Sequence, residues 1–183
     1  MPEAKMILNV PQMVMERALK LTVPSDHPAL KALDDKKDVV LIETNLYLAA
    51  DYAAAIGNEW CRRTGAPTAY FTATEWHRYE RNDDSPTDYH DSFRDFLLKP
   101  DLLIMVGLSY MKTAAAMSSM DAALNRRVQA GKRTLISGWN MPVGKFKFQT
   151  GQEMAADSMS RFPLLHQRAV LPDLTLLTSF KEE

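Results

Sequence analysis

Cysteine is almost absent from this sequence, in which Cys61 is the single cysteine among 183 residues. An internal disulfide is therefore excluded, and a lone cysteine favours a buried thiol in a reducing compartment. Long apolar runs are also lacking, because no segment reaches the roughly 18 apolar residues that a membrane-spanning helix needs. The N-terminal segment has no cationic stretch followed by a long apolar run, which is the pattern of an export signal. We therefore expect a cytoplasmic protein without a membrane span.

Net charge is nearly absent as well, since 22 basic and 23 acidic residues leave a formal charge of -1. This balance argues against a broad cationic surface that wraps nucleic acid, although it allows a local basic patch. Any contact with DNA is expected to be focal or accessory. Internal repeats and low-complexity tracts are missing too, and a content of 46% hydrophobic residues is typical of an ordinary globular domain.

What the sequence does contain is an alternation of short apolar runs with longer helical patterns. Helical spacing covers Leu48 to Arg63 and Ala114 to Ala130. Continuous apolar runs such as LLIMV indicate strands that are buried on both faces. We therefore predict an α/β fold with a doubly wound, mainly parallel sheet of five strands. The predicted strands are Asp38 to Ile42, Thr68 to Thr72, Leu102 to Val106, Thr134 to Ser137, and Ala169 to Leu171 with its continuation through Leu174.

Two domain-level units are predicted, an N-terminal arm over residues 1–37 and an α/β domain over residues 38–183. In the arm we expect a short helix from Gln12 to Leu21, and we interpret three prolines as breakers. An apolar stripe flanks Arg17 on this helix. It is compatible equally with docking a partner and with covering the sheet. The stripe consists of Met13, Val14, Ala18 and Leu21, and the prolines are Pro11, Pro24 and Pro28.

Helix ends are marked by two glycines. Gly65 and Gly131 follow pairs of arginines, at positions where a helix C-cap belongs. Positive charge suits the carboxyl end of a helix, so these arginines are interpreted as structural. The pairs are Arg62 with Arg63 and Arg126 with Arg127.

Several segments carry a family resemblance through their order and spacing. They are AIGNEWCRRTG from Ala55, TAYFTATEW from Thr68, KPDLLIMVGLS from Lys99, MDAALNRRVQAGKRTLISGWNMP from Met120 and RAVLPDL from Arg168. In this register the span from Ala29 to Leu174 resembles the IstB and DnaC type of AAA+ ATPase, whose members are transposition helpers and loaders of replicative helicases. The resemblance implies a P-loop NTPase fold with a RecA-like core.

The chain departs from the family at the phosphate loop. A phosphate loop needs glycines that turn backbone N–H groups inward, a lysine, and a hydroxyl for magnesium. By register with the family, Ala49 and Ala50 stand where the lysine and the hydroxyl would be. The glycine positions hold Glu43, Leu46 and Leu48, whose side chains would block or repel a polyphosphate.

A second departure lies at the Walker B position. The family carries two acids after an apolar strand, one for magnesium and one for the attacking water. Val106 and Gly107 replace them here. Because two separate sites have both lost their chemistry, we expect no catalytic residues, no bound nucleotide cofactor, no metal and no enzymatic activity.

Several other residues are candidates for contacts with a partner or with DNA rather than for catalysis. Asn140 corresponds to a sensor asparagine in the resemblance, but a hydrogen bond within its loop is the favoured interpretation. Arg161 resembles a basic residue near the C-terminus, for which surface or interface pairing is favoured. In GKFKF, an extended strand would place Lys145 and Lys147 on one face and Phe146 and Phe148 on the other. That arrangement suits single-stranded nucleic acid, although packing of a hairpin explains it better.

One stretch contains metal-ligand residue types without the spacing of a known metal site. A solvated acidic loop is its favoured interpretation. The residues are His77, Asp83, Asp84, Asp88, His90 and Asp91.

The resemblance implies that the protein binds a partner, rather than that it catalyses a reaction. The first hypothesis is a non-catalytic DNA replication accessory protein, encoded by a phage or mobile element, that binds a replicative helicase or its loader. It would recruit or inhibit the helicase without ATP. The alternative is an inactive regulatory subunit of an AAA+ ATPase or transposase complex. A true enzyme with a relocated nucleotide site is disfavoured by the two departures.

Overall fold

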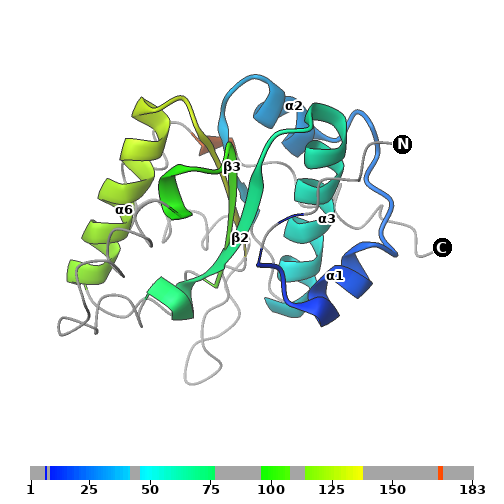
Figure 1. Ribbon diagram of the computed structural model, residues 1–183, viewed down its shortest axis with the longest axis horizontal. Coiled ribbons are helices and arrows are strands. Elements are labelled where there is room, and N and C mark those ends of the chain that lie inside the picture. The colour runs from blue at the N-terminus through cyan, green and yellow to red at the C-terminus, as the bar shows by residue number, and fades with distance from the viewer. Residues whose placement is uncertain are drawn as a thin grey trace, which may run out of the picture.

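A computed structural model of the chain describes residues 7, 9–41, 46–76, 96–107, 114–137 and 169–170. Within these residues the architecture has three layers, with a central sheet between two helical layers (Figure 1). The predicted α/β class with a doubly wound parallel sheet is confirmed.

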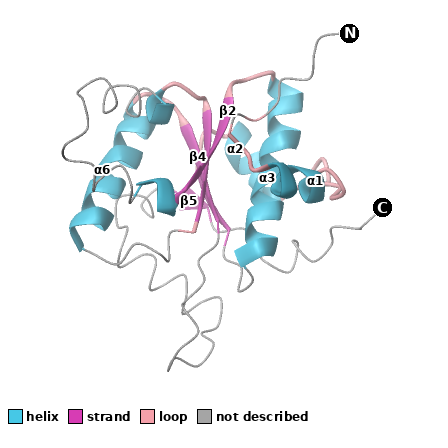
Figure 2. Cartoon of the chain, turned by 60° about the horizontal axis from the view of Figure 1, so that its bottom comes forward, coloured by secondary structure: helices cyan, strands magenta, loops and turns pink. Residues whose placement is uncertain are grey.

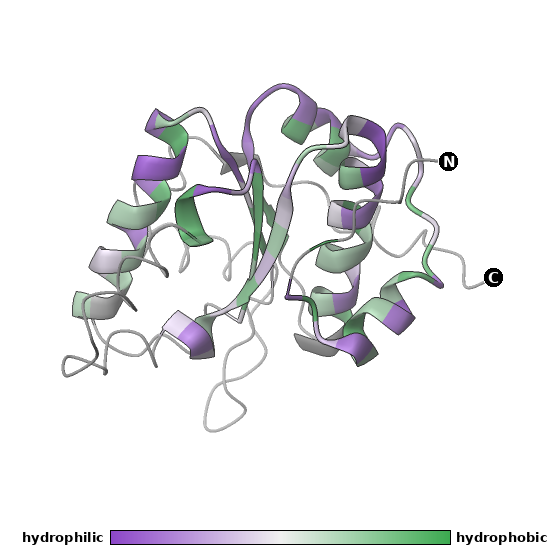
Figure 3. Cartoon of the chain, viewed as in Figure 1, coloured by the Kyte–Doolittle hydropathy of each residue, from purple (hydrophilic) through white to green (hydrophobic). Residues whose placement is uncertain are grey.

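The sheet has five parallel strands in the order β2-β3-β4-β1-β5. Where the structure describes them, their bounds agree with the predicted runs to within a few residues; the predicted continuation of the last strand through Leu174 lies outside the described residues. They are β1 Asp38–Leu41, β2 Thr68–Thr72, β3 Leu102–Val106, β4 Arg133–Ser137 and β5 Ala169–Val170. All residues of β1 and β3 are buried, as expected for parallel strands with helices on both faces. The apolar colouring of the central strands is visible in Figure 3.

Helices cover the two faces of the sheet unequally. The helix α3, Leu46–Thr64, lies on one face together with α1, Gln12–Ala18, and α2, Pro28–Asp34. The helix α6, Ala114–Gln129, lies on the opposite face (Figure 2). Because α3 follows β1 and α6 follows β3, the chain leaves these two strands toward different faces. Such a divergence places ligand sites of open α/β sheets at the carboxyl ends of the strands.

Both predicted helix caps are confirmed by backbone geometry. Gly65 follows α3 with a φ of 65°, and its N–H donates to the carbonyl of Cys61 at 2.8 Å. Gly131 has a φ of 70° and donates to Val128 at 2.9 Å. A residue without a Cβ adopts this left-handed conformation at no steric cost.

The arm differs from its prediction in two ways. The first helix ends at Ala18 rather than at Leu21, since Leu19 and Lys20 form a turn. Pro28 does not break structure but begins the second helix at N1, where proline lacks no needed donor and its φ is suitable. The helix α2 was not anticipated because Pro28 was interpreted as a breaker.

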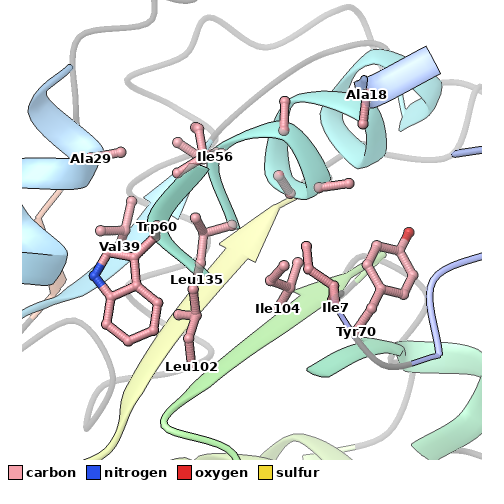
Figure 4. Close-up of a cluster of buried hydrophobic side chains, with 14 of the residues drawn as sticks. Ile7, Ala18, Ala29, Val39, Ile56, Trp60, Tyr70, Leu102, Ile104 and Leu135 are labelled. Carbon is pink, nitrogen blue, oxygen red and sulfur yellow. The ribbon is translucent and has the colours of Figure 1, made fainter. Parts of the chain in front are cut away.

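The core consists of two clusters, one on each face of the sheet. The cluster beneath α3 joins side chains of helix and strands, such as Trp60, Ile104 and Leu135 (Figure 4). It also includes seven residues of the arm, which lie far apart in the sequence from the strands they meet. They are Ile7, Met15, Ala18, Ala29, Leu30, Ala32 and Leu33. The arm therefore packs on the same core as the domain that follows it.

Cys61 is buried on α3, as the sequence favoured. No helix within the described residues is long and apolar enough to cross a membrane.

Candidate functional site at the carboxyl edge of the sheet

The strands end level with one another at one edge of the sheet. Val106 of β3 is in register with Ser137 of β4, and Ser137 is in register with Leu41 of β1. The helix α3 begins at Leu46, shortly after β1. The positions assigned by the resemblance to the phosphate loop and to Walker B therefore lie at the same edge.

Three apolar residues, Leu48, Ala49 and Ala50, lie in the first turn and a half of α3. Ala49 and Ala50, at the positions of the lysine and the hydroxyl in the resemblance, are both buried. Leu48 is 42% exposed, so its side chain lies partly at the surface of this edge. Alanine has no group that could neutralise a phosphate or bind magnesium.

The end of β3 is equally without charge. Val106 is buried, and Gly107 follows it with a φ of 84°. The N–H of Gly107 donates to the carbonyl of Ser137 at 3.0 Å, which continues the pairing of β3 with β4 beyond the strand. The two positions of the acidic pair thus hold an aliphatic side chain and a hydrogen atom.

Ser137 links the two halves of this site. Its Oγ donates a hydrogen bond to the carbonyl oxygen of Ala49, although the two residues are 88 positions apart. Ser137 is fully buried. A buried hydroxyl that is paired in this way holds the start of α3 against the end of β4. No local pattern in the sequence predicts this contact, because a serine at a strand end has many partners available to it.

An ion pair involves Asp51, the residue that follows Ala50 on α3. The guanidinium Nε of Arg17, from α1, donates to Asp51 Oδ2 at 2.7 Å, and the Asp51 side chain is only 7% exposed. Tyr70 of β2 lies close to this pair: burial first, and then the Asp51 carboxylate, raise the pKa of its phenol well above its usual range. An acidic residue among the alanines of α3 was the only hint in the sequence.

A carboxylate also lies at the end of β2, where it is occupied by its own turn. Glu75 accepts hydrogen bonds from the backbone N–H of Thr72 at 2.6 Å and from its Oγ1 at 2.7 Å. This arrangement caps the short helical turn after β2. Its local role is therefore explained without a ligand.

The remaining predicted contacts divide between the arm and the rest of the chain. Met13 is 69% exposed on α1, so it does not lie on the buried side of that helix, whereas Arg17 is held by Asp51. All other proposed contact positions lie outside the described residues, as does the acidic stretch from His77 to Asp91. They are Asn140, Lys145, Phe146, Lys147, Phe148 and Arg161. Of the phosphate-loop positions, Glu43 and the side chain of Leu46 also lie outside the described residues. The described residues contain no cluster of three or more metal-ligand side chains.

The fold is similar to those of several solved proteins of DNA replication. The structure of DnaI superposes with a TM-score of 0.59 at 14% identity, covering 91% of this chain and 95% of that one. Domain III of the Thermotoga maritima replication initiation protein DnaA gives 0.56 at 15% identity, with coverages of 95% and 68%. A DNA replication initiation factor gives 0.54 at 14% identity; 80% of this chain is covered, but less than half of that protein, 43%.

At 14–15% identity these similarities show that the fold is shared with these proteins. No family model matches the sequence, and no curated protein matches it significantly.

Proposed function

We propose that this protein is a DNA replication accessory factor that binds a replicative helicase or its loader and acts without binding or hydrolysing ATP. One observation carries the ATP-independent part of the proposal. The carboxyl edge of the sheet is built as in an AAA+ fold, yet Ala49, Ala50 and Val106 are buried and apolar there and Gly107 has no side chain.

The physical argument concerns charge. A nucleotide brings a polyphosphate and magnesium, which a P-loop protein stabilises with a lysine, a hydroxyl and two carboxylates. A buried charge without such partners costs several kcal/mol. The carbonyl of Ala49 is already used by Ser137. None of the described residues at these positions offers a compensating group, which supports a function based on contact.

The proposed partner rests on the replication proteins that share this fold and on the helicase loaders that the sequence resembles. Loaders act by touching the helicase, and contact is independent of catalysis. Two large apolar side chains are exposed on α1 and the turn that follows it, namely Met13 at 69% and Leu19 at 63% exposure. Apolar side chains such as these can supply contacts in the core of an interface. We propose that α1 forms part of the helicase-binding surface. We further propose that the gene belongs to a phage or mobile element.

The proposal is tested by mixing the purified protein with the replicative helicase hexamer of its host and resolving the mixture by size-exclusion chromatography. We expect a complex without nucleotide, and an equal amount of it with ATP and magnesium. A complex that forms only with ATP would contradict the ATP-independent mode. Absence of a complex, or recovery from host extract of an AAA+ ATPase alone, would favour the alternative of an inactive subunit.

Matched variants locate the surface. Met13→Ser combined with Leu19→Ser should weaken the complex at least tenfold, because it removes apolar groups without touching the core. Lys20→Ser, an exposed change beside them, is the control and should leave binding within about twofold, as surface changes outside a hot spot usually do. Equal binding by both variants would exclude α1 from the interface.

A further inference from the structure

The arm contains two helices of equal length that are held very differently. Both α1 and α2 have seven residues. In α2 four side chains are buried, and the His27 side chain caps the first turn. In α1 only Met15 and Ala18 are buried, and Pro11 at the N-cap provides no side-chain cap. A helix this short has no stability of its own in water, so α1 depends on its contacts with α3.

One contact of α1 is polar and partly buried. Arg17 is 40% exposed, whereas its partner Asp51 lies beneath it at 7%. The second carboxylate oxygen, Asp51 Oδ1, is buried and has no hydrogen-bond partner among the described residues. The Asp51 carboxylate is therefore desolvated while α1 is in place, and Arg17 offsets that cost only at Oδ2.

We propose that α1 is a releasable strap on α3, with the Arg17–Asp51 ion pair as its clasp. In the closed position Met15 and Ala18 are buried while Asp51 is only partly satisfied. When α1 lifts, those two side chains and the partly buried Val14 lose their packing, but water reaches both oxygens of Asp51. The loss of apolar packing and the regained solvation of Asp51 oppose each other. The closed and the open state of α1 are therefore close in free energy, as is typical of segments that open locally.

Opening would uncover a defined face of α3. Ala55 lies one turn beyond Asp51, on the same side of the helix, and it is buried in the closed position. Met15, Ala18 and Ala55 belong to the same core cluster. Release of the strap would therefore expose a small-residue face next to a carboxylate, while β1, β3 and β4 stay intact. The inference concerns motion of the arm alone and does not depend on the proposed helicase partner.

Hydrogen exchange measured residue by residue on the full chain tests the strap. The amides of Met15 and Leu19 donate to Pro11 and Met15 within α1, and those of Lys31 and Asp35 make the equivalent bonds around α2. We expect the α1 amides to exchange at least tenfold faster than the α2 amides, with little dependence on low denaturant. If all four amides exchanged only through global unfolding, with one shared denaturant dependence, the strap would be excluded.

Three variants test the clasp itself. Arg17→Met should speed exchange of the α1 amides at least a further tenfold and leave the amides of β3 within about threefold. Arg17→Met with Asp51→Ala removes the buried charge as well and should return the α1 amides to near the wild-type rate. The control is Arg62→Met, which breaks the exposed pair of Arg62 with Glu59 at the other end of α3. Equal exchange in Arg17→Met and Arg62→Met, or no recovery in the double variant, would overturn the clasp.

Discussion

At the scale of single residues, His27 couples the start of α2 to pH. Its Nδ1 accepts a hydrogen bond from the Ala29 N–H at 3.2 Å, which requires a neutral ring. Burial lowers the pKa of His27 below its ordinary 6.5, against the opposing charge of Asp26. As the pH falls, His27 is therefore protonated at a higher pH in the unfolded chain than in the folded protein. The stability contributed by His27 is fully present above pH 6.5 and is lost as the pH falls through the lower folded value.

The variant His27→Asn isolates this effect, because asparagine caps a helix equally well without titrating. Denaturant unfolding between pH 7.5 and about pH 5 should show a steeper loss of stability for the wild type than for the variant. All other titrating groups are shared by the two chains and cancel in the difference. Parallel pH profiles would contradict the assignment.

Gly57 shows how closely α3 approaches the sheet. A Cβ at this position would lie 2.2 Å from Ile104 Cδ1 and 3.1 Å from its Cγ1. Ile104 is fully buried and has little room to move. Gly57→Ala gains about 1 kcal/mol of helix propensity but overpacks the core, which costs roughly 1–3 kcal/mol. We expect a net destabilisation of about 1 kcal/mol.

A double-mutant cycle identifies the clash as the cause. Ile104→Val removes Cδ1, so Gly57→Ala should cost at least about 1 kcal/mol less in that background than in the wild type. The measurement is the free energy of unfolding of the four proteins. Additive effects would mean that the contact with Ile104 does not limit the size of the side chain at position 57.

At the scale of elements, a buried arginine fastens α6 to the sheet. Arg127 donates to the carbonyls of Leu97, Pro100 and Arg133 and to Thr134 Oγ1. Burial lowers its pKa to about 10, so it stays charged at neutral pH. The C-cap interpretation of Arg126 and Arg127 was therefore incomplete, because Arg127 serves mainly the loop before β3 and the start of β4.

Arg127→Met should destabilise the protein by about 2–4 kcal/mol, since it leaves several buried carbonyls without donors. Its neighbour Arg126 is exposed, so Arg126→Met is the matched control and should change stability by less than about 0.5 kcal/mol. Both values come from urea denaturation. Similar losses in the two variants would refute the role of Arg127 as the fastening residue.

The sequence predicted which residues form the main elements but not how they meet. Strands such as Leu102–Val106 are continuous apolar runs between turn residues, which is a local signal. The order β2-β3-β4-β1-β5 was not predicted, because it depends on connections that cross the sheet. The helix α2 was also missed, since the sequence alone does not distinguish a proline that begins a helix at N1 from a proline that breaks a helix.

The candidate site shows the same division. Ala49, Ala50, Val106 and Gly107 were located through the register of the family resemblance, and the structure places them at one edge. Ser137 and Asp51 were missed because their partners, Ala49 and Arg17, lie 88 and 34 positions away. Contacts of this range leave no periodicity in the sequence. Partner-binding residues on the arm stay a prediction.

At the scale of the whole molecule, the arm and the α/β domain share one core, with Ile7 and Met15 packed in the same cluster as Ile104. We therefore expect one cooperative unfolding transition for β1 to β4 and α3, with α1 opening separately and earlier. We assign the proposed function to the surface of this unit, because the described positions Ala49, Ala50, Val106 and Gly107 at its carboxyl edge are small or apolar.

The central proposal is that this α/β scaffold works without nucleotide, and the melting temperature in ATP and magnesium tests it most directly. A ligand that binds only the folded state at about 100 times its Kd stabilises a protein by about 2.7 kcal/mol, which raises the melting temperature of a chain of this size by several degrees. We predict no shift up to millimolar ATP with magnesium. A saturable rise in melting temperature would contradict the account.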